Sequence, residues 1–154
     1  MQSDDVYLTK FRATVNGLEA WAATLMDVAV IETGSDERCW RIACVPHALQ
    51  ACSFELMLRR DQCFDLTVGP ETYEDQPIAS LDMFKPLLAA IVAGRVVTSV
   101  WSTAGTGLRT GLATHITPPA SEPWSASRTL HTRTQARDEV QRRDHHYVPY
   151  ARGA

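Results

Sequence analysis

The sequence lacks the signatures of export and of membrane insertion. Residues 1–5 read MQSDD, whereas a secretory leader opens with positive charge and continues into an apolar run. The most apolar stretch, residues 18–31, includes Glu19 and Asp27, and it is too short to cross a bilayer as a helix. We therefore expect a cytoplasmic protein without a membrane partner.

The chain also lacks a large excess of either charge. It carries 15 Lys and Arg against 18 Asp and Glu, a net charge of −3. Nucleic-acid-binding proteins concentrate basic side chains against phosphates, so we expect no nucleic-acid partner. Residues 1–119 hold nine basic and fourteen acidic side chains, and residues 120–154 hold six and four. This asymmetry predicts an α+β domain over 1–119 and a polar, mildly basic C-terminal extension over 120–154.

Metal-binding and catalytic motifs are missing as well. The chain contains no HExxH, GxSxG or Walker lysine motif. Cys39 and Cys44 lie five residues apart on a predicted strand, where their side chains point to opposite faces and cannot converge on zinc. His145 and His146 are adjacent, and two neighbouring side chains on a helix diverge by about 100°. We therefore expect no metal and no cofactor.

What the chain does have is enough apolar content for one globular core. Hydrophobic residues make up 45% of its 154 residues, which is ordinary for a single domain. Apolar residues recur every three or four positions from Leu8 to Val28, which predicts an amphipathic helix. Because the interior Gly17 costs about 1 kcal/mol relative to alanine, an alternative is a helix that starts at Asn16.

Three segments with a period of two follow the helix. Alternation over residues 40–44, 54–58 and 64–68 predicts half-buried strands. A three-residue loop at 60–62 fixes one register for the last two strands, in which six apolar side chains share one face. The predicted cross-strand pairs are Leu58 with Phe64, Leu56 with Leu66, and Phe54 with Val68.

A short helix and a second hairpin complete the predicted domain. We expect an acidic loop over residues 71–78, then a helix capped by Ser80 or Asp82 that ends before Gly94. Strands over 95–102 and 107–116 would then turn at Ala104-Gly105. That turn predicts three cross-strand pairs, namely Trp101 with Leu108, Ser99 with Thr110, and Val97 with Leu112.

The C-terminal extension is predicted to be helical or irregular. Residues 125–144 are compatible with a helix, but only Leu130, Ala136 and Val140 are apolar along it, too few to stabilise an isolated helix. Residues 147–150 are aromatic without forming a core. We expect this tail either to move freely or to dock on another surface.

Together these elements predict an α+β fold of order α-βββ-α-ββ. A long N-terminal helix would pack on a twisted, roughly five-stranded antiparallel sheet. The order of elements resembles that of cystatin-like folds and of the small chaperones of type III secretion. The resemblance is one of topology, and fold analogy does not carry function.

The candidate site residues come from the sheet face opposite the helix. Alternation places Asp65 and His115 there as a potential acid–base pair, and Arg41, Arg59 and Arg109 as a potential clamp for an anion. The alternative is a solvated polar face, which antiparallel sheets commonly have. The same face is expected to carry apolar residues that suggest cover by the tail or a second subunit, namely Ala43, Val45, Met57, Val96 and Val100.

These features leave three hypotheses. The first is a non-catalytic interaction domain that self-associates, as a homodimer, through the second sheet face. The second is an enzyme or binding protein for a small anionic ligand on that same face. The third is a secretion-type chaperone or adaptor with a protein partner, which rests on element order and acidic charge.

Overall fold

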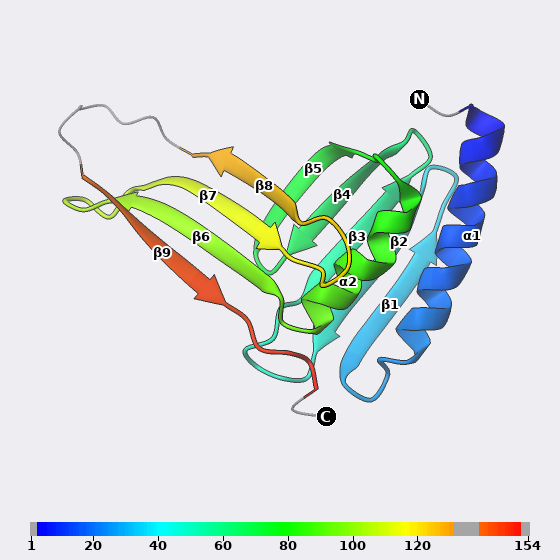
Figure 1. The fold of residues 1–154 in the computed structure, drawn as a ribbon, viewed down its shortest axis with the longest axis horizontal. Helices are drawn as coiled ribbons and strands as arrows, with labels where there is room; N and C mark the ends of the chain where they lie inside the picture. Colours follow the sequence, from blue (N-terminus) through cyan, green and yellow to red (C-terminus); the bar gives the residue numbers. More distant parts are fainter. Residues whose placement is uncertain (1–2, 131–138, 152–154) are drawn as a thin grey trace.

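The fold is α+β, as predicted, but it contains two sheets instead of one. The computed structural model describes residues 3–130 and 139–151. Helix α1 (Asp4–Ala23) precedes a five-stranded antiparallel sheet, called sheet A here. A short 3-10 turn, η1 (Leu81–Met83), leads into helix α2 (Phe84–Val92), and a four-stranded antiparallel sheet, called sheet B, follows. Both helices lie on one side of sheet A, and sheet B extends away beside it (Figure 1).

Helix α1 is amphipathic, and its length shows that Gly17 does not delay its start. The buried residues Tyr7, Phe11, Leu18 and Ala22 follow steps of four, seven and four, so they share the stripe that faces the sheet. Asp4 and Asp5 in the first turn favour the positive end of the helix dipole. The alternative of a helix beginning at Asn16 is therefore wrong.

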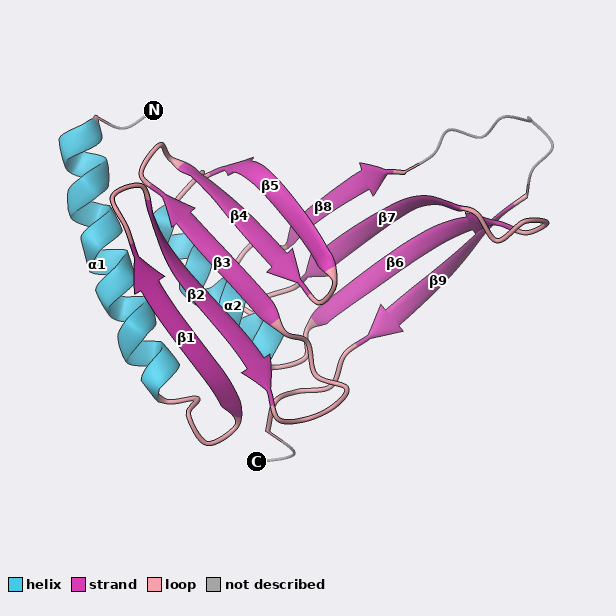
Figure 2. Cartoon of the chain, turned by 180° about the vertical axis from the view of Figure 1, so that it is seen from behind, coloured by secondary structure: helices cyan, strands magenta, loops and turns pink. Residues whose placement is uncertain are grey.

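Sheet A is a meander in which each strand pairs with the next. Its strands are β1 (Ala29–Ser35), β2 (Cys39–Pro46), β3 (Phe54–Arg59), β4 (Cys63–Val68) and β5 (Glu71–Pro77). The predicted register of β3 with β4 is confirmed, pairing Leu58 with Phe64, Leu56 with Leu66 and Phe54 with Val68. All six side chains are buried. The face away from the helices carries no helix over it (Figure 2).

Two strands of sheet A were not predicted. In β1 only Ala29 is fully buried and all of the last four residues are exposed. The strand therefore has almost no alternation of apolar and polar residues. In β5, which we expected to be an acidic loop, Tyr73 is the one buried residue and a register shift interrupts pairing with β4. Edge strands with polar residues form here because their neighbours supply the hydrogen-bond partners.

Sheet B replaces the predicted helical or irregular tail. Its order is β8 (Trp124–Thr129), β7 (Arg109–Ile116), β6 (Val96–Thr103) and β9 (Val140–His146). The prediction of a helical or irregular tail is thus wrong for the two segments that form β8 and β9, and residues 131–138 lie outside the described residues. Both flanking segments instead complete the backbone ladders of the central hairpin.

The second hairpin exists, but its register differs from the prediction. Val100 pairs with Leu112 and Trp101 with Gly111, and the register shifts between Trp101 and Ser102. The turn therefore holds more residues than a tight turn at Ala104-Gly105 would. A bulge of this kind adds a residue to one strand and cannot be read from alternation alone.

Residues 147–150, called the C-terminal strap here, fasten sheet B to the body. The Tyr150 side chain is buried in the core and its hydroxyl donates a hydrogen bond to the Cys52 carbonyl. The Val148 amide donates to the Gln50 carbonyl at 3.1 Å, and the Tyr150 amide donates to the Val92 carbonyl at 2.9 Å. The strap crosses Gly94, where an added Cβ would lie 2.8 Å from the Pro149 nitrogen.

Candidate functional site

Arg59 and Asp65, two of the predicted site residues, do lie together. An Arg59 guanidinium nitrogen is 3.3 Å from an Asp65 carboxylate oxygen, and the same guanidinium also pairs with Asp61 and Asp75. The hydrogen bonds that Arg59 donates to Asp61 and Asp75 raise the pKa of Arg59, and the guanidinium lowers the pKa of Asp61. Arg59 is thus already surrounded by carboxylates of its own chain.

The other three predicted residues lie apart from that network. Arg41 on β2 donates to Glu55 on β3 at 2.6 Å, a hydrogen bond that raises the pKa of Arg41. Arg109 and His115 are exposed residues of β7 in sheet B. The prediction placed all five on one sheet, and the chain after α2 starts a second sheet instead. The predicted acid–base pair of Asp65 with His115 therefore spans two sheets.

The side of sheet A away from the helices is called the open face here. On β2 the residues Trp40, Ile42 and Cys44 are buried against the helices, so the alternate residues point outward. The same alternation applies on β1, β3 and β4. The outward residues are Val30, Glu32, Arg41, Ala43, Val45, Glu55, Met57, Arg59, Asp65 and Thr67.

One end of the open face is apolar and unusually exposed. Val30 and Val45 are direct cross-strand partners and retain 56% and 58% of their accessible surface. Ala43 adjoins Val45 on the same face of β2, and Met57 lies farther along the face, opposite Arg41. Because the arginines of this face are already paired with Glu55 and with aspartates, it presents apolar surface and neutralised charge side by side. Val96 and Val100, which we expected on this face, lie in sheet B.

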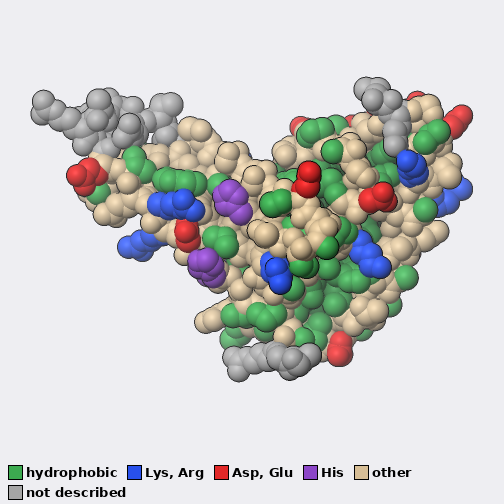
Figure 3. All heavy atoms as spheres, in the orientation of Figure 1, with side chains coloured by type: hydrophobic (Ala, Val, Ile, Leu, Met, Phe, Trp, Pro, Cys, Tyr) green, Lys and Arg blue, Asp and Glu red, His purple; other side chains and the backbone are tan. Residues whose placement is uncertain are grey.

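The other side of sheet A carries a groove between its two helices. On this side of the molecule hydrophobic side chains gather beside α2, with isolated charged side chains among them (Figure 3). The groove, called the helix groove here, has a volume of about 470 Å³. Its buried leucines, Leu18 of α1 and Leu81 of η1, form an apolar floor. Ser80 caps η1 by accepting a hydrogen bond from the Asp82 amide at 3.2 Å.

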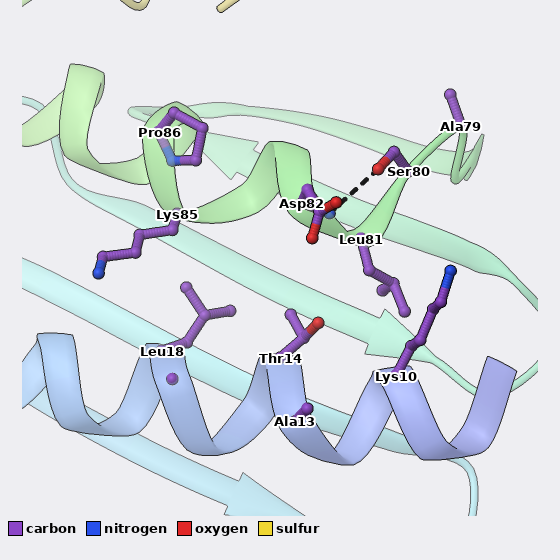
Figure 4. Close-up of a pocket in the computed structure, with 11 residues that line it drawn as sticks. Lys10, Ala13, Thr14, Leu18, Ala79, Ser80, Leu81, Asp82, Lys85 and Pro86 are labelled. Carbon is purple, nitrogen blue, oxygen red and sulfur yellow. Dashed lines mark hydrogen bonds between the residues drawn. The ribbon is translucent and has the colours of Figure 1, made fainter. Parts of the chain in front are cut away.

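Three charged side chains line the helix groove. Lys10 from α1 and Lys85 from α2 lie at its opposite ends, with Asp82 and Thr14 between them (Figure 4). Within residues 3–130 and 139–151, neither lysine amine nor the Asp82 carboxylate has an ion-pair or hydrogen-bond partner. The groove thus offers cations at its ends and an anion at its centre.

The sequence contained a signal for this groove that the motif analysis missed. Lys10 and Lys85 are the only lysines of the chain, since the other 13 of its 15 basic residues are arginine. The two are 75 positions apart, and the fold brings both to one groove. Unlike arginine, lysine presents a compact, freely rotating ammonium group. The scarcity of lysine was visible in the composition, but its meaning required the packing of α1 beside η1.

Cysteine and histidine chemistry finds no site in the described part of the chain. No group of three His, Cys, Asp or Glu side chains there is arranged to hold a metal ion. All four cysteines are free, and burial raises the pKa of the Cys52 thiol to about 12. His145 and His146 are successive residues of β9, so they point to opposite faces of sheet B. His131 lies outside the described residues.

Two general findings complete the description, one on membrane spans and one on similarity to known proteins. Across residues 3–130 and 139–151, neither helix has the length and hydropathy that a bilayer-spanning segment needs. Searches against protein-family models, curated proteins and solved structures give no match. Its function is therefore inferred from the geometry of the chain itself.

Proposed function

We propose that this protein is a non-catalytic interaction domain that forms a homodimer through the open face of sheet A. The observation that carries the proposal is the Val30–Val45 pair, two apolar side chains that each remain more than half exposed although they are direct partners in a regular ladder. Fully burying a valine side chain stabilises by about 1.5 kcal/mol or more. An apolar sheet face of this kind usually marks a contact surface.

A second copy is the occupant that suits the charges of this face. Arg41 is paired with Glu55, and Arg59 with Asp65, within the same chain. Both arginines of this face are thus paired within the chain, so the contact needs no anion from a partner, and a second copy of the same face meets that requirement. A two-fold axis would set the valine patch of one copy against the same patch of the other, the usual arrangement in soluble homodimers.

The same ion pairs support the non-catalytic part of the proposal. Asp65 accepts hydrogen bonds from Arg59 and from the Asp75 amide at 2.8 Å, so its carboxylate is committed to holding β3, β4 and β5 together. An acid–base pair also needs both groups within reach of one substrate, and His115 belongs to sheet B. An anion clamp at Arg41 and Arg59 would likewise require breaking pairs that already exist.

The test is the oligomeric state of a charge variant. Val45→Lys places a cation in the proposed contact, where each copy would bring one to the axis. We expect light scattering over a dilution series to show a dimer for the wild type, and a dissociation constant raised at least about tenfold for Val45→Lys. Leu108→Lys is the matched control, because Leu108 is also an exposed apolar residue but belongs to the loop before β7 in sheet B. A wild type that stays monomeric at all concentrations, or a Val45→Lys dimer as tight as wild type, refutes the proposal.

A further inference from the structure

We propose that the helix groove is a docking site for a short, extended acidic segment of a partner protein. Such a segment would place acidic side chains at Lys10 and Lys85, an apolar side chain on the leucine floor, and backbone N–H groups against Asp82. This inference goes beyond dimerisation, because the groove is lined by α1, η1 and α2, and the helices lie on the side of sheet A opposite the open face (Figures 1 and 2). One chain can therefore use both surfaces at once.

The lysines are the first step of the argument. A chain of 154 residues contains just two, and both line the same groove from opposite walls. Within the part of the chain that the structure describes, nothing pairs with either amine. Of the ten arginines in the described residues, four are paired with carboxylates, namely Arg41, Arg59, Arg128 and Arg142. Two unpaired ammonium groups at the ends of one groove favour a ligand with an anionic group at each end.

Asp82 favours a peptide over a simple dianion as the ligand of the groove. Its carboxylate lies between the two lysines (Figure 4), where an aliphatic dicarboxylate has only methylene groups and would cover Asp82 without giving it a hydrogen bond. A peptide differs, because its backbone N–H groups are donors and a carboxylate accepts from them strongly. Thr14 and Ser80 add hydroxyl groups to the same stretch of the groove, and hydroxyls can meet either a backbone N–H or a carbonyl.

The dimensions set the length of the segment. Leu18 marks the Lys85 end of the groove (Figure 4) and is eight residues from Lys10 on α1, which corresponds to about 12 Å along a helix. An extended peptide advances about 3.3 Å per residue, so the first and fifth residues of a pentapeptide span the same distance. Side chains one, three and five of that pentapeptide share a side. The predicted ligand pattern is therefore acidic, any, apolar, any, acidic.

The probe is the capped pentapeptide Glu-Ser-Leu-Ser-Glu, and the lysines themselves provide the readout. Reductive methylation with isotope-labelled formaldehyde keeps the lysine charge and labels only Lys10, Lys85 and the chain's terminal amine. We expect titration at low ionic strength to shift both lysine signals with one saturation curve. The Lys10→Glu/Lys85→Glu double variant, measured with a fluorescent form of the peptide, should bind at least about tenfold more weakly, as the loss of two charge pairs implies.

Arg12→Glu is the matched control for charge. Arg12 is exposed on α1, two residues from Lys10, but it lines a different hollow beside Trp40 and Arg60. It should keep the peptide affinity within about twofold, because it lies outside the groove. The double lysine variant should still form the dimer, and Val45→Lys should still bind the peptide. The two proposals can thus fail separately.

Three results would overturn the docking site. One is a peptide that shifts neither lysine signal up to its solubility limit. Another is equal affinity for the peptide in which glutamine replaces both glutamates. The third is suberate, a plain dicarboxylate, binding as tightly as the peptide and tightening further in Asp82→Asn, which would identify a simple anion site. The docking site predicts the reverse for Asp82→Asn, namely weaker peptide binding.

Discussion

The C-terminal strap offers the sharpest test of the fold, through Tyr150. This side chain is 4% exposed and sits in the main core, although it lies five residues from the end of the chain. Replacing a buried aromatic ring by alanine removes its burial and leaves a cavity, which costs about 3–5 kcal/mol. For a domain of this length, that loss lowers the Tm by about 6–20 °C.

Tyr150→Phe separates the ring from its hydroxyl. The variant keeps the packing but loses the hydrogen bond to the Cys52 carbonyl, and a buried hydrogen bond contributes about 1 kcal/mol. Thermal unfolding followed by circular dichroism should therefore order the proteins as wild type, Tyr150→Phe and Tyr150→Ala. Val148→Ala is the control within the strap, because Val148 is 37% exposed, and it should cost less than about 1 kcal/mol.

The result that would refute this reasoning is specific. If Tyr150→Ala unfolds within about 2 °C of the wild type, the ring contributes no more than a surface residue does. The strap would then not be docked in the core, and the attachment of sheet B through it would be wrong. Equal losses from Tyr150→Phe and Tyr150→Ala would instead assign the whole effect to the hydrogen bond.

Two further predictions concern the strap and the tyrosines. Gly94 has a φ of 77° and no room for a Cβ beside Pro149, so Gly94→Ala should lower the free energy of unfolding in urea by about 2 kcal/mol or more. Gly34→Ala, where a Cβ meets nothing within 4 Å, should leave that free energy almost unchanged. A larger loss for Gly34→Ala than for Gly94→Ala would contradict the packing. Burial raises the pKa of all four tyrosines, with Tyr7 raised to about 12, so tyrosinate absorbance should stay low at about pH 10, where free phenols are half ionised. Because a raised folded pKa stabilises the native state below the unfolded pKa, stability should fall as the pH rises above about 10; half-ionised tyrosines in a protein with native circular dichroism at that pH would disprove this. The tyrosines whose pKa is raised are Tyr7, Tyr73, Tyr147 and Tyr150.

The sequence predicted those elements whose alternation or helical period is apolar on one side. The hairpin of β3 and β4 is the best example, because one register buries six side chains and a slip of one residue exposes them. By contrast, every residue of β9 is exposed, so its sequence has no apolar alternation from which the strand could be predicted. This strand forms because β6 offers it a complete ladder of partners from Val97 to Thr103, a tertiary effect that overrides local propensity.

The candidate sites divide in the same way. The mixed apolar and charged character of the open face followed from alternation along β2 and β3, and Val45 and Met57 do lie on it. The clamp of Arg41, Arg59 and Arg109 required strands from both halves of the chain to share one sheet, and the second half builds its own. The helix groove depended on where α2 lies relative to α1, which local patterns do not encode.

The docking of Tyr150 also bears on how the chain is made. Residues 52 and 150 are separated by 98 positions, and synthesis proceeds from the N-terminus. While residues 147–150 are still inside the ribosomal exit tunnel, the core beside Cys52 stays open in the part of the chain already made. The native interior can close only after Tyr150 has left the tunnel, so a stop codon that removes the chain from residue 147 onward should yield protein that cells degrade.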